Sequence, residues 1–434
     1  MPQANRNPSV AGSIRVSQDG RYFVDAQGQP FFWLGDTAWP LFAQYSREDA
    51  EAYLENRARK GFTVIQGVLA WGGGTGFETT APGPNYAGHV PWLDGRPDRL
   101  NDAYFQHVDY LLRFAAERGL VLGLLPTWGY YVNDARTFNV DSARTFNVDS
   151  ARAYGRWLGA RYKDQPNLVW INGGDRIPTG SEPVYRALAQ GLREGDNGAH
   201  LITYHPCGWR SSAQFFHRED WLDFNMIETW TEWAKVYPAI LSDSLLRPTK
   251  PVVLGEGAYE NGPEYPLGPI TPLVVRRQAW WAFMAGGFFT YGQDQMWRME
   301  PGWTSTFDAP GAGHMTQFKS IATSRPWWKR VPDQGLFASG VGSERTLNAA
   351  VRSIDSDWAM LYLSSQCHVL LHLDKLLTRQ VKATWVNPQD GEQRDAGTYA
   401  TGNLLGGTFP EARTQWFSVP GHWEDALLLL DGTP

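Results

Sequence analysis

The sequence predicts an α/β fold in which a (β/α)8 TIM barrel is followed by a smaller antiparallel β-sandwich. Three observations predict it. Eight short apolar runs recur along most of the chain, segments with helical periodicity separate them, and after about residue 333 short strands and turn signals replace the helices. A chain of 434 residues with 42% hydrophobic and only 19% charged residues can bury a large core, which excludes a disordered protein.

Residues 1–30 are expected to form an N-terminal extension and a β-hairpin. Ile14–Val16 and Tyr22–Val24 flank the turn signal Gln18-Asp19-Gly20. The residues from Met1 to Ile14 lack the apolar segment of a signal peptide, which favours a cytoplasmic location, with a secreted or periplasmic one if the chain has been trimmed. The sequence contains no stretch of about 18 apolar residues, which a membrane-spanning helix would need, so a membrane partner is not expected.

Residues 31–332 are expected to form the barrel. Alternating strands and helices imply right-handed crossovers and a parallel sheet buried on both faces, and eight such units close most naturally into a (β/α)8 barrel. The predicted strands are Phe31–Gly35, Val64–Leu69, Val121–Leu125, Leu168–Ile171, Leu201–Tyr204, Phe224–Ile227, Val252–Leu254 and Gly287–Tyr291. The predicted helices are Arg47–Arg59, Tyr104–Glu117, Ala151–Arg161, Val184–Arg193, Tyr237–Leu246, Val274–Ala285 and Met315–Thr323.

An identical octapeptide, ARTFNVDS, occurs twice in tandem, at Ala135–Ser142 and Ala143–Ser150. A single duplication of this length does not indicate a solenoid. We expect it to lengthen the loop after the third strand or to add turns to the next helix, with Asp149 or Ser150 as the N-cap.

Residues 333–434 are expected to form the antiparallel β-sandwich. The predicted strands are short and separated by Gly, Asn, Asp and Pro, as in Asn387–Gly391. They include Asp357–Leu363, His368–Leu373, Gln380–Val386 and Ala426–Leu430.

The composition indicates which classes of binding partner the protein can have. The net charge is −6 and the basic residues are scattered, so nucleic acid is a poor partner. Cys207 and Cys367 lie far apart, and the nine histidines form no metal-binding motif, so no disulfide, metal or cofactor is expected. The 21 tryptophans modestly favour a carbohydrate ligand, because indole faces suit sugar rings. The oligomeric state is left open between a monomer and a small homo-oligomer.

Candidate site residues follow from the barrel, since its active site lies at the C-terminal ends of the strands. Carboxylates at the ends of the fourth and seventh strands fit glycoside hydrolysis, which needs one protonated carboxyl for the leaving oxygen and one ionised carboxylate at the anomeric carbon. The candidate catalytic residues are therefore Asp175 and Glu256, each beside glycines that permit a tight turn or close backbone approach. The candidate sugar-binding residues are Asp36, Trp39, Gln66, Trp71, Trp128, Asn172, Arg176, His205, Glu228, Tyr291 and Trp297.

Structural roles for the same residues remain open. Asp175 could cap a helix or pair with Arg176, and Glu256 could bond to neighbouring amides. Asp36 could equally cap a loop, the tryptophans could be packing residues, and His205 fits a structural histidine. Glu228 is a third strand-end carboxylate that could replace Asp175 in catalysis.

Several motifs carry a family resemblance. The sequence resembles the apiosidase-like glycoside hydrolases, glycoside hydrolase family 140, and its C-terminal part resembles the collagen-binding-type β-domain of such proteins. The motifs that carry the resemblance are Leu34–Trp39, Ala151–Asp175, His205–Ser212, Trp221–Ile227, Lys250–Glu260, Ser324–Gln334, Trp385–Glu392 and Trp423–Leu430. The resemblance implies a catalytic barrel with Asp175 at the acid/base position and Glu256 at the nucleophile position. The chain departs from the family pattern at Glu228-Thr229-Trp230 and at Gln293, on the rim that selects the substrate.

The resulting hypothesis is a retaining exo-glycosidase that releases β-linked apiose from plant glycans or glycosides, with its carboxylates about 5–5.5 Å apart. One alternative is another furanosidase or pentosidase, such as an arabinofuranosidase, or an endo-glycanase. An alternative of a different class is a non-catalytic carbohydrate- or matrix-binding protein.

Overall fold

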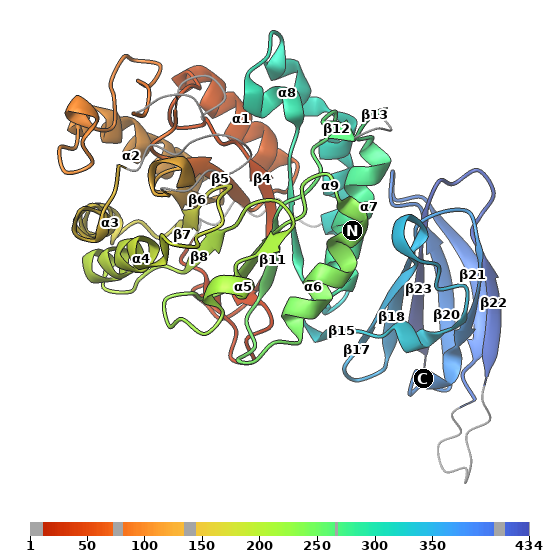
Figure 1. Ribbon diagram of the computed structural model, residues 1–434. Helices are drawn as coiled ribbons and strands as arrows, with labels where there is room; N and C mark the ends of the chain where they lie inside the picture. The colour runs from red at the N-terminus through yellow and green to blue at the C-terminus, as the bar shows by residue number, and fades with distance from the viewer. Residues whose placement is uncertain (1–11, 73–80, 134–144, 265–267, 403–412, 434) are drawn as a thin grey trace.

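The computed structural model describes residues 12–72, 81–133, 145–264, 268–402 and 413–433 (Figure 1). The predicted extension before residue 12 and the first copy of the octapeptide, residues 135–142, lie outside the described residues. Figure 1 shows a barrel ringed by helices and, beside it, a β-sandwich drawn in blue.

The eight predicted apolar runs form the eight parallel strands of the barrel. They are β4 (Leu34–Thr37), β5 (Val64–Val68), β6 (Val121–Leu125), β7 (Leu168–Gly173), β8 (Ile202–His205), β10 (Asn225–Glu228), β11 (Val252–Glu256) and β14 (Phe288–Tyr291). The sheet order is β8-β7-β6-β5-β4-β14-β11-β10, with the short β9 (Arg210–Ser211) antiparallel on β10. The barrel closes between β8 and β10, where Thr203 Oγ1 donates a hydrogen bond to the carbonyl of Phe224 at 2.6 Å.

Helices surround this sheet in the described part of the chain. They are α1 (Arg47–Arg59), α2 (Asp102–Glu117), α3 (Val148–Tyr162), α4 (Glu182–Asp196), α5 (Ala213–Phe216), α6 (Val236–Ser244), α7 (Pro272–Met284), α8 (Asp294–Arg298) and α9 (Pro310–Ala322). Seven of them match the predicted helices, whereas the short α5 and α8 were not predicted. A short β12 (Pro263–Glu264) pairs with β13 (Gly268–Pro269) before α7.

The start of α3 corrects one expectation. The N-cap is Asn147, whose side chain accepts a hydrogen bond from the amide of Ser150, while the Ser150 hydroxyl accepts one from the amide of Asn147. Neither Asp149 nor Ser150 is the N-cap, because the reciprocal capping box satisfies the backbone N–H groups of Asn147 and Ser150. The second copy of the octapeptide therefore supplies the first turn of α3.

The N-terminal hairpin closes the bottom of the barrel. Strands β1 (Arg15–Val16), β2 (Phe23–Val24) and β3 (Pro30–Phe31) form a small antiparallel sheet. The buried ring of Phe23 lies 5.2 to 5.5 Å from Trp33, Phe224 and Phe288, which are at or next to the starts of β4, β10 and β14. The opposite end of the strands is thus the end left for a site.

The C-terminal part is a sandwich of two antiparallel sheets. One has the order β15-β17-β18-β23-β20-β21 and the other β16-β19-β22. The strands are β15 (Arg330–Pro332), β16 (Phe337–Ser339), β17 (Ala349–Ser353), β18 (Trp358–Leu363), β19 (His368–His372), β20 (Gln380–Val386), β21 (Gln393–Ala400), β22 (Thr414–Ser418) and β23 (Ala426–Thr433). Because β15 pairs with β17, the sandwich begins three residues earlier than the predicted boundary at 333.

Strand β18, in the middle of the larger sheet, is buried on both faces. Along β18, Met360 and Tyr362 belong to the core shared with the barrel, whereas Leu361 and Leu363 belong to the core of the sandwich. This double burial explains why β18 is apolar throughout instead of alternating.

Helix α7 joins the two parts. Its Trp280 stacks on Tyr362 at 6.1 Å between ring centroids, and its Arg276 donates two hydrogen bonds to Asp425 at 2.7 and 2.9 Å. The Tyr362 hydroxyl also donates to Asp425 at 2.7 Å. Arg276 and Asp425 are both buried, so this interface contains a buried ion pair.

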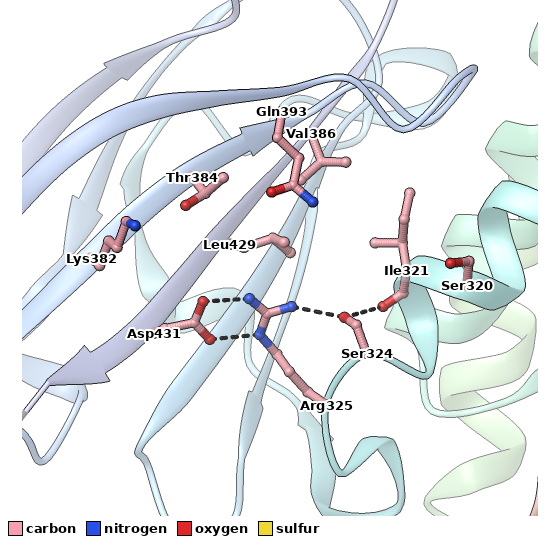
Figure 2. A pocket seen from close by; sticks show the side chains of 10 residues that line it. All are labelled: Ser320, Ile321, Ser324, Arg325, Lys382, Thr384, Val386, Gln393, Leu429 and Asp431. Atoms are coloured by element: carbon pink, nitrogen blue, oxygen red, sulfur yellow. Dashed lines mark hydrogen bonds and ion pairs between the residues drawn. The ribbon is translucent and has the colours of Figure 1, made fainter. Parts of the chain in front are cut away.

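A hollow of about 450 Å³ lies at the same junction, beyond the end of α9 (Figure 2). Arg325 crosses it to form a two-pronged ion pair with Asp431 on β23, and its Nη1 donates to Ser324 Oγ at 2.9 Å. The guanidinium is therefore already satisfied within the protein.

Both cysteines, buried Cys207 and half-buried Cys367, are free thiols. Among the described residues, no helix has the length and apolar character required to cross a membrane.

Candidate active site

Four titratable side chains meet at the C-terminal end of the barrel. His205, Glu228 and Glu256 are the last residues of β8, β10 and β11, and Asp175 follows β7 by two residues. One nitrogen or oxygen atom of each side chain lies within 4.8 Å of those of the other three. The four residues form the carboxyl cluster, which is buried except for the partly exposed Asp175.

The glycines after β7 aim Asp175 into the cluster. Gly173 and Gly174 have φ values of +89° and +112°, which residues with a side chain rarely adopt. A Cβ on Gly173 would collide with the carbonyl oxygen of His205, and one on Gly174 would lie 2.6 Å from the ring of Trp128. Asp175 itself has φ +49°. It caps no helix, because α4 begins at Glu182, and it is held at the mouth by this turn.

His205 and Glu256 form an ion pair. His205 Nε2 lies 3.2 Å from Glu256 Oε2, while Nδ1 lies 2.9 Å from the carbonyl oxygen of Pro206, which needs a proton donor. Burial alone would lower the pKa of His205, but its contact with Glu256 and the charges of Glu256 and Asp175 raise the pKa above its ordinary value. His205 Nε2 therefore faces the Glu256 carboxyl group within ion-pair distance.

Burial and neighbouring charges raise the pKa of both Asp175 and Glu228. Burial, followed by the charge of Glu256, raises the pKa of Asp175 to about 6. Burial and the charges of Asp175 and Glu256 raise the pKa of Glu228 well above its ordinary value. A hydrogen bond joins the two carboxyl groups, lowering the pKa of Asp175 and raising that of Glu228, so Glu228 is the donor. Three carboxyl groups this close cannot all be ionised.

The carboxyl cluster also offers four donor atoms at a spacing that suits a hard cation. Sequence spacing could not reveal this set, because its members come from four separate strands. The contact of His205 with Glu256 and the raised pKa values of Asp175 and Glu228 favour proton transfer as the chemistry of the cluster.

Several predicted binding residues surround the cluster. Gln66 crosses the barrel and donates from Nε2 to the carbonyl of Gly255 at 2.9 Å, next to Glu256. The ring of Trp39 lies 5.2 Å from that of His205, and Trp128 lies 5.4 Å from both Trp39 and Trp71. These three indoles are almost fully buried and form an aromatic wall behind His205.

Other predicted binding residues are occupied elsewhere. Asp36 is fully buried, and its Oδ2 accepts hydrogen bonds from Tyr53 and Arg57. Tyr291 donates to Glu260 Oε2 at 2.6 Å. Neither partner was foreseen from the sequence. These contacts favour structural roles for Asp36 and Tyr291 over sugar binding.

The remaining three lie near the rim. Arg176 is buried and donates from Nη1 to the backbone carbonyl of Asp175 at 2.8 Å, so it supports the turn and does not pair with the carboxylate. Asn172 is buried in β7, with Nδ2 3.4 Å from the carbonyl of Tyr185. Trp297 lies on α8 and donates to Asp294 at 3.2 Å.

Two residues near the site, Tyr259 and Trp209, were not among the predicted site residues, and Trp230 was noted only as part of the rim. Tyr259 accepts a hydrogen bond from Trp39 Nε1 at 2.8 Å and forms another with Glu256. Its position three residues after Glu256 was the available signal. Trp209 and Trp230 are 41% and 37% exposed at the rim, beyond the ends of β8 and β10.

Comparisons with known families divide the chain into the same two parts. Residues 17–329 match the model of the family described as "Apiosidase-like, catalytic domain". Residues 331–431 match "Putative collagen-binding domain of a collagenase". A search of the curated proteins found none that matches this chain.

Solved structures agree with this assignment. A structure titled "Glycoside hydrolase" is 28% identical, with a TM-score of 0.86 and coverage of 99% of both chains. A glycoside hydrolase family 5 protein from Bacteroides vulgatus is 27% identical, with a TM-score of 0.85 and coverage of 99% of this chain and 95% of the other. A β-L-arabinopyranosidase from Geobacillus stearothermophilus, at 11% identity, TM-score 0.56 and coverage of 93% and 97%, shares the fold alone.

These matches exclude the non-catalytic alternative and agree with a barrel whose mouth holds paired carboxyl groups. The chain therefore belongs to the apiosidase-like family and is a glycoside hydrolase.

Proposed function

We propose that this glycosidase is a retaining, exo-acting enzyme that releases β-linked apiose from plant glycans or apiosylated glycosides. The observation that supports retention is the proximity of Asp175 and Glu256, whose nearest ligand oxygens lie within 4.8 Å. Retaining enzymes hold their two carboxyl groups about 5–5.5 Å apart, whereas inverting enzymes leave about 6.5–9.5 Å for a water molecule.

In the first step, Asp175 donates a proton to the leaving oxygen while Glu256 attacks the anomeric carbon. The raised pKa of Asp175, about 6, suits this role because a useful fraction of the carboxyl stays protonated in mildly acidic conditions. His205 and Tyr259 contact Glu256 and hold it in place. In the second step Asp175 deprotonates a water molecule, which attacks the glycosyl–enzyme ester and regenerates Glu256.

Glu228 has a supporting part in this scheme. It donates a hydrogen bond to Asp175 and stays neutral itself, so it stabilises the ionised form of Asp175 that follows proton transfer. The alternative is that Glu228 is the acid and Asp175 its partner. The turn that projects Asp175 beyond the end of its strand favours Asp175, because Glu228 is more deeply enclosed.

The family match supports apiose as the sugar. Arabinofuranose or another pentose, and internal cleavage by an endo-glycanase, are the alternatives. The rim residues Glu228 and Trp230, where the chain departs from the family pattern, bear on this choice.

Product analysis tests the proposal. Wild-type enzyme is incubated with apiosylated glycans, an aryl β-apioside and aryl arabinofuranosides, and the first-formed anomer is observed by NMR. We expect free apiose that first appears as the β-anomer. Release of another sugar, or of oligosaccharides only, would overturn the substrate, and an α-anomer would overturn retention.

Variants assign the roles of the two carboxyl groups. Glu256→Ala is expected to abolish turnover and to regain it with azide, forming the α-glycosyl azide. Asp175→Ala is expected to retain turnover only on substrates with activated leaving groups, forming the β-glycosyl azide. The matched control is Asp355→Ala, a carboxylate that pairs with Lys329 on the surface of the sandwich. Unchanged turnover in both active-site variants would refute the mechanism.

A further inference from the structure

Trp209 and Trp230 stand out among the aromatic residues at the barrel mouth. Trp39, Trp71 and Trp128 are at most 2% exposed, whereas Trp209 and Trp230 are 41% and 37% exposed. Their rings form an edge-to-face pair with centroids 5.5 Å apart and planes at 61°. The two rings together are here called the rim pair.

The backbone holds the rim pair in an unusual conformation. Trp209 has φ +64° and Trp230 has φ +45°, in the left-handed region that bulky residues rarely adopt. Such strain persists only where the surrounding structure enforces it, and it concentrates at ligand clamps. The loop of Trp230 is fixed to the next strand by a hydrogen bond from the amide of Thr229 to the carbonyl of Glu256 at 2.9 Å. Two strained tryptophans on adjacent strand ends therefore keep their rings partly in solvent.

The rim pair lies close to the carboxyl cluster. Gly208 separates them, since a Cβ at this position would lie 3.3 Å from Glu228 Oε1 and 3.5 Å from the Cβ of Trp230. Glu228 in turn bonds to Asp175. A ligand atom next to Asp175 is therefore separated from the rim pair by Glu228 and Gly208.

The position of the rim pair relative to Asp175 and Glu256 determines which part of the substrate can contact it. The sugar that Glu256 attacks must lie between Glu256 and Asp175, inside the mouth. The leaving group is bonded to the oxygen that Asp175 protonates, so it extends outward on the Asp175 side. Indole faces bind flat apolar ring faces, of either a sugar or an aromatic aglycone.

We propose that Trp209 and Trp230 form the leaving-group subsite, which binds a ring with an apolar face attached to the scissile oxygen. The proposal rests on the glycosidase mechanism above, and it adds a specificity determinant to it. Ring binding at this subsite stabilises substrates that carry a ring in the leaving group, and it contributes nothing when the leaving group is a single atom.

The test compares leaving groups with and without a ring. Full-length wild type, Trp209→Ala, Trp230→Ala and Trp209→Phe are assayed on 4-nitrophenyl β-apioside, on an apiosyl-rhamnoside and on β-apiosyl fluoride. Both alanine variants are expected to lower kcat/KM about five- to tenfold on the two ring-bearing substrates, with a change below about twofold on the fluoride. Trp209→Phe is expected to regain most of the loss. The aryl and sugar arms show which kind of ring the subsite prefers.

The control is Trp416→Ala, because Trp416 is 56% exposed on β22 of the sandwich, away from the barrel mouth. It should leave all three substrates unaffected. Equal losses on the ring-bearing substrates and the fluoride would overturn the proposal, because they would indicate damage to the carboxyl cluster. Unchanged kcat/KM on the ring-bearing substrates would overturn it as well.

A binding measurement separates this proposal from the proposed function. Saturation-transfer NMR records contact between 4-nitrophenyl β-apioside and the inactive Glu256→Gln enzyme, with and without Trp209→Ala. Saturation transfer to the aryl protons in Glu256→Gln that disappears in Glu256→Gln/Trp209→Ala supports the subsite, even if no turnover is found. Aryl transfer that survives the loss of Trp209, or no transfer in Glu256→Gln, contradicts it. Absence of turnover by wild type on every substrate would count against the proposed function instead.

Discussion

The buried ion pair of Asp36 and Arg57 offers a prediction that separates a structural residue from a sugar ligand. Both side chains are fully inaccessible to solvent. Arg57 also donates to the carbonyl of Phe307 at 2.7 Å and to Asn56 Oδ1 at 2.8 Å, so Asp36 is the carboxylate that balances its charge. Asp36→Ala would leave the guanidinium buried without its counter-ion.

The expected loss follows from the burial of both partners. Removing one partner of a buried ion pair costs about 3–5 kcal/mol. For a barrel of about 300 residues that unfolds as a unit, the unfolding entropy near 2.1 cal/mol/K per residue converts about 4 kcal/mol into a fall in Tm of about 6 °C. The surface pair of Lys60 and Asp308, in which the Asp308 side chain is 76% exposed, serves as the control, and Asp308→Asn should lower Tm by no more than about 1–2 °C.

Differential scanning fluorimetry and steady-state kinetics provide the assay. We expect Asp36→Ala to lower Tm with little change in KM at a temperature where it stays folded. The double variant Asp36→Leu/Arg57→Met should recover much of the lost stability, because an apolar pair of similar volume can replace a buried ion pair. A raised KM with an unchanged Tm would refute this reasoning and assign Asp36 to the substrate.

The remaining predictions concern pH, backbone strain and the domain interface. Because the acid must be protonated, kcat/KM should fall as the pH rises through about 6, the raised pKa of Asp175. Glu228→Ala should move this fall to higher pH, because it removes a hydrogen bond that lowers the pKa of Asp175. Glu228→Gln keeps a hydrogen-bond donor and should leave the fall at the same pH. A pH–rate profile that is the same in all three enzymes would contradict the assignment. Gly173→Ala adds a Cβ at φ +89° and should lower kcat at least about tenfold, because it displaces the turn that holds Asp175. Full activity of this variant would contradict the prediction. Arg276→Ala leaves Asp425 buried without its counter-ion, so thermal unfolding and limited proteolysis should show the sandwich released first, at a cost of about 3–5 kcal/mol. Unchanged unfolding would argue against this role.

The sequence analysis located the strands well because a parallel barrel strand must be apolar throughout. It located Asp175 and Glu256 because the topology of the barrel places the ends of all strands at one mouth. It assigned Asp36 and Tyr291 to the sugar by the same rule, and this assignment stays a prediction, because the rule does not say which way a strand-end side chain points. A strand-end residue can also point toward the surrounding helices, and Arg57 on α1 and Glu260 after β11 supply the partners that hold these two.

By itself, the sequence determined the order of strands and helices, the division into barrel and sandwich, and the two carboxyl groups at the ends of the fourth and seventh strands. These features depend on local periodicity and on chain order. The tertiary structure alone decided that His205 pairs with Glu256, that Glu228 forms a hydrogen bond with Asp175, and that Trp209 meets Trp230 at the rim. Ion pairs, hydrogen bonds and ring contacts depend on distances of a few ångströms between residues far apart in the chain, and such distances exist only after the barrel has closed.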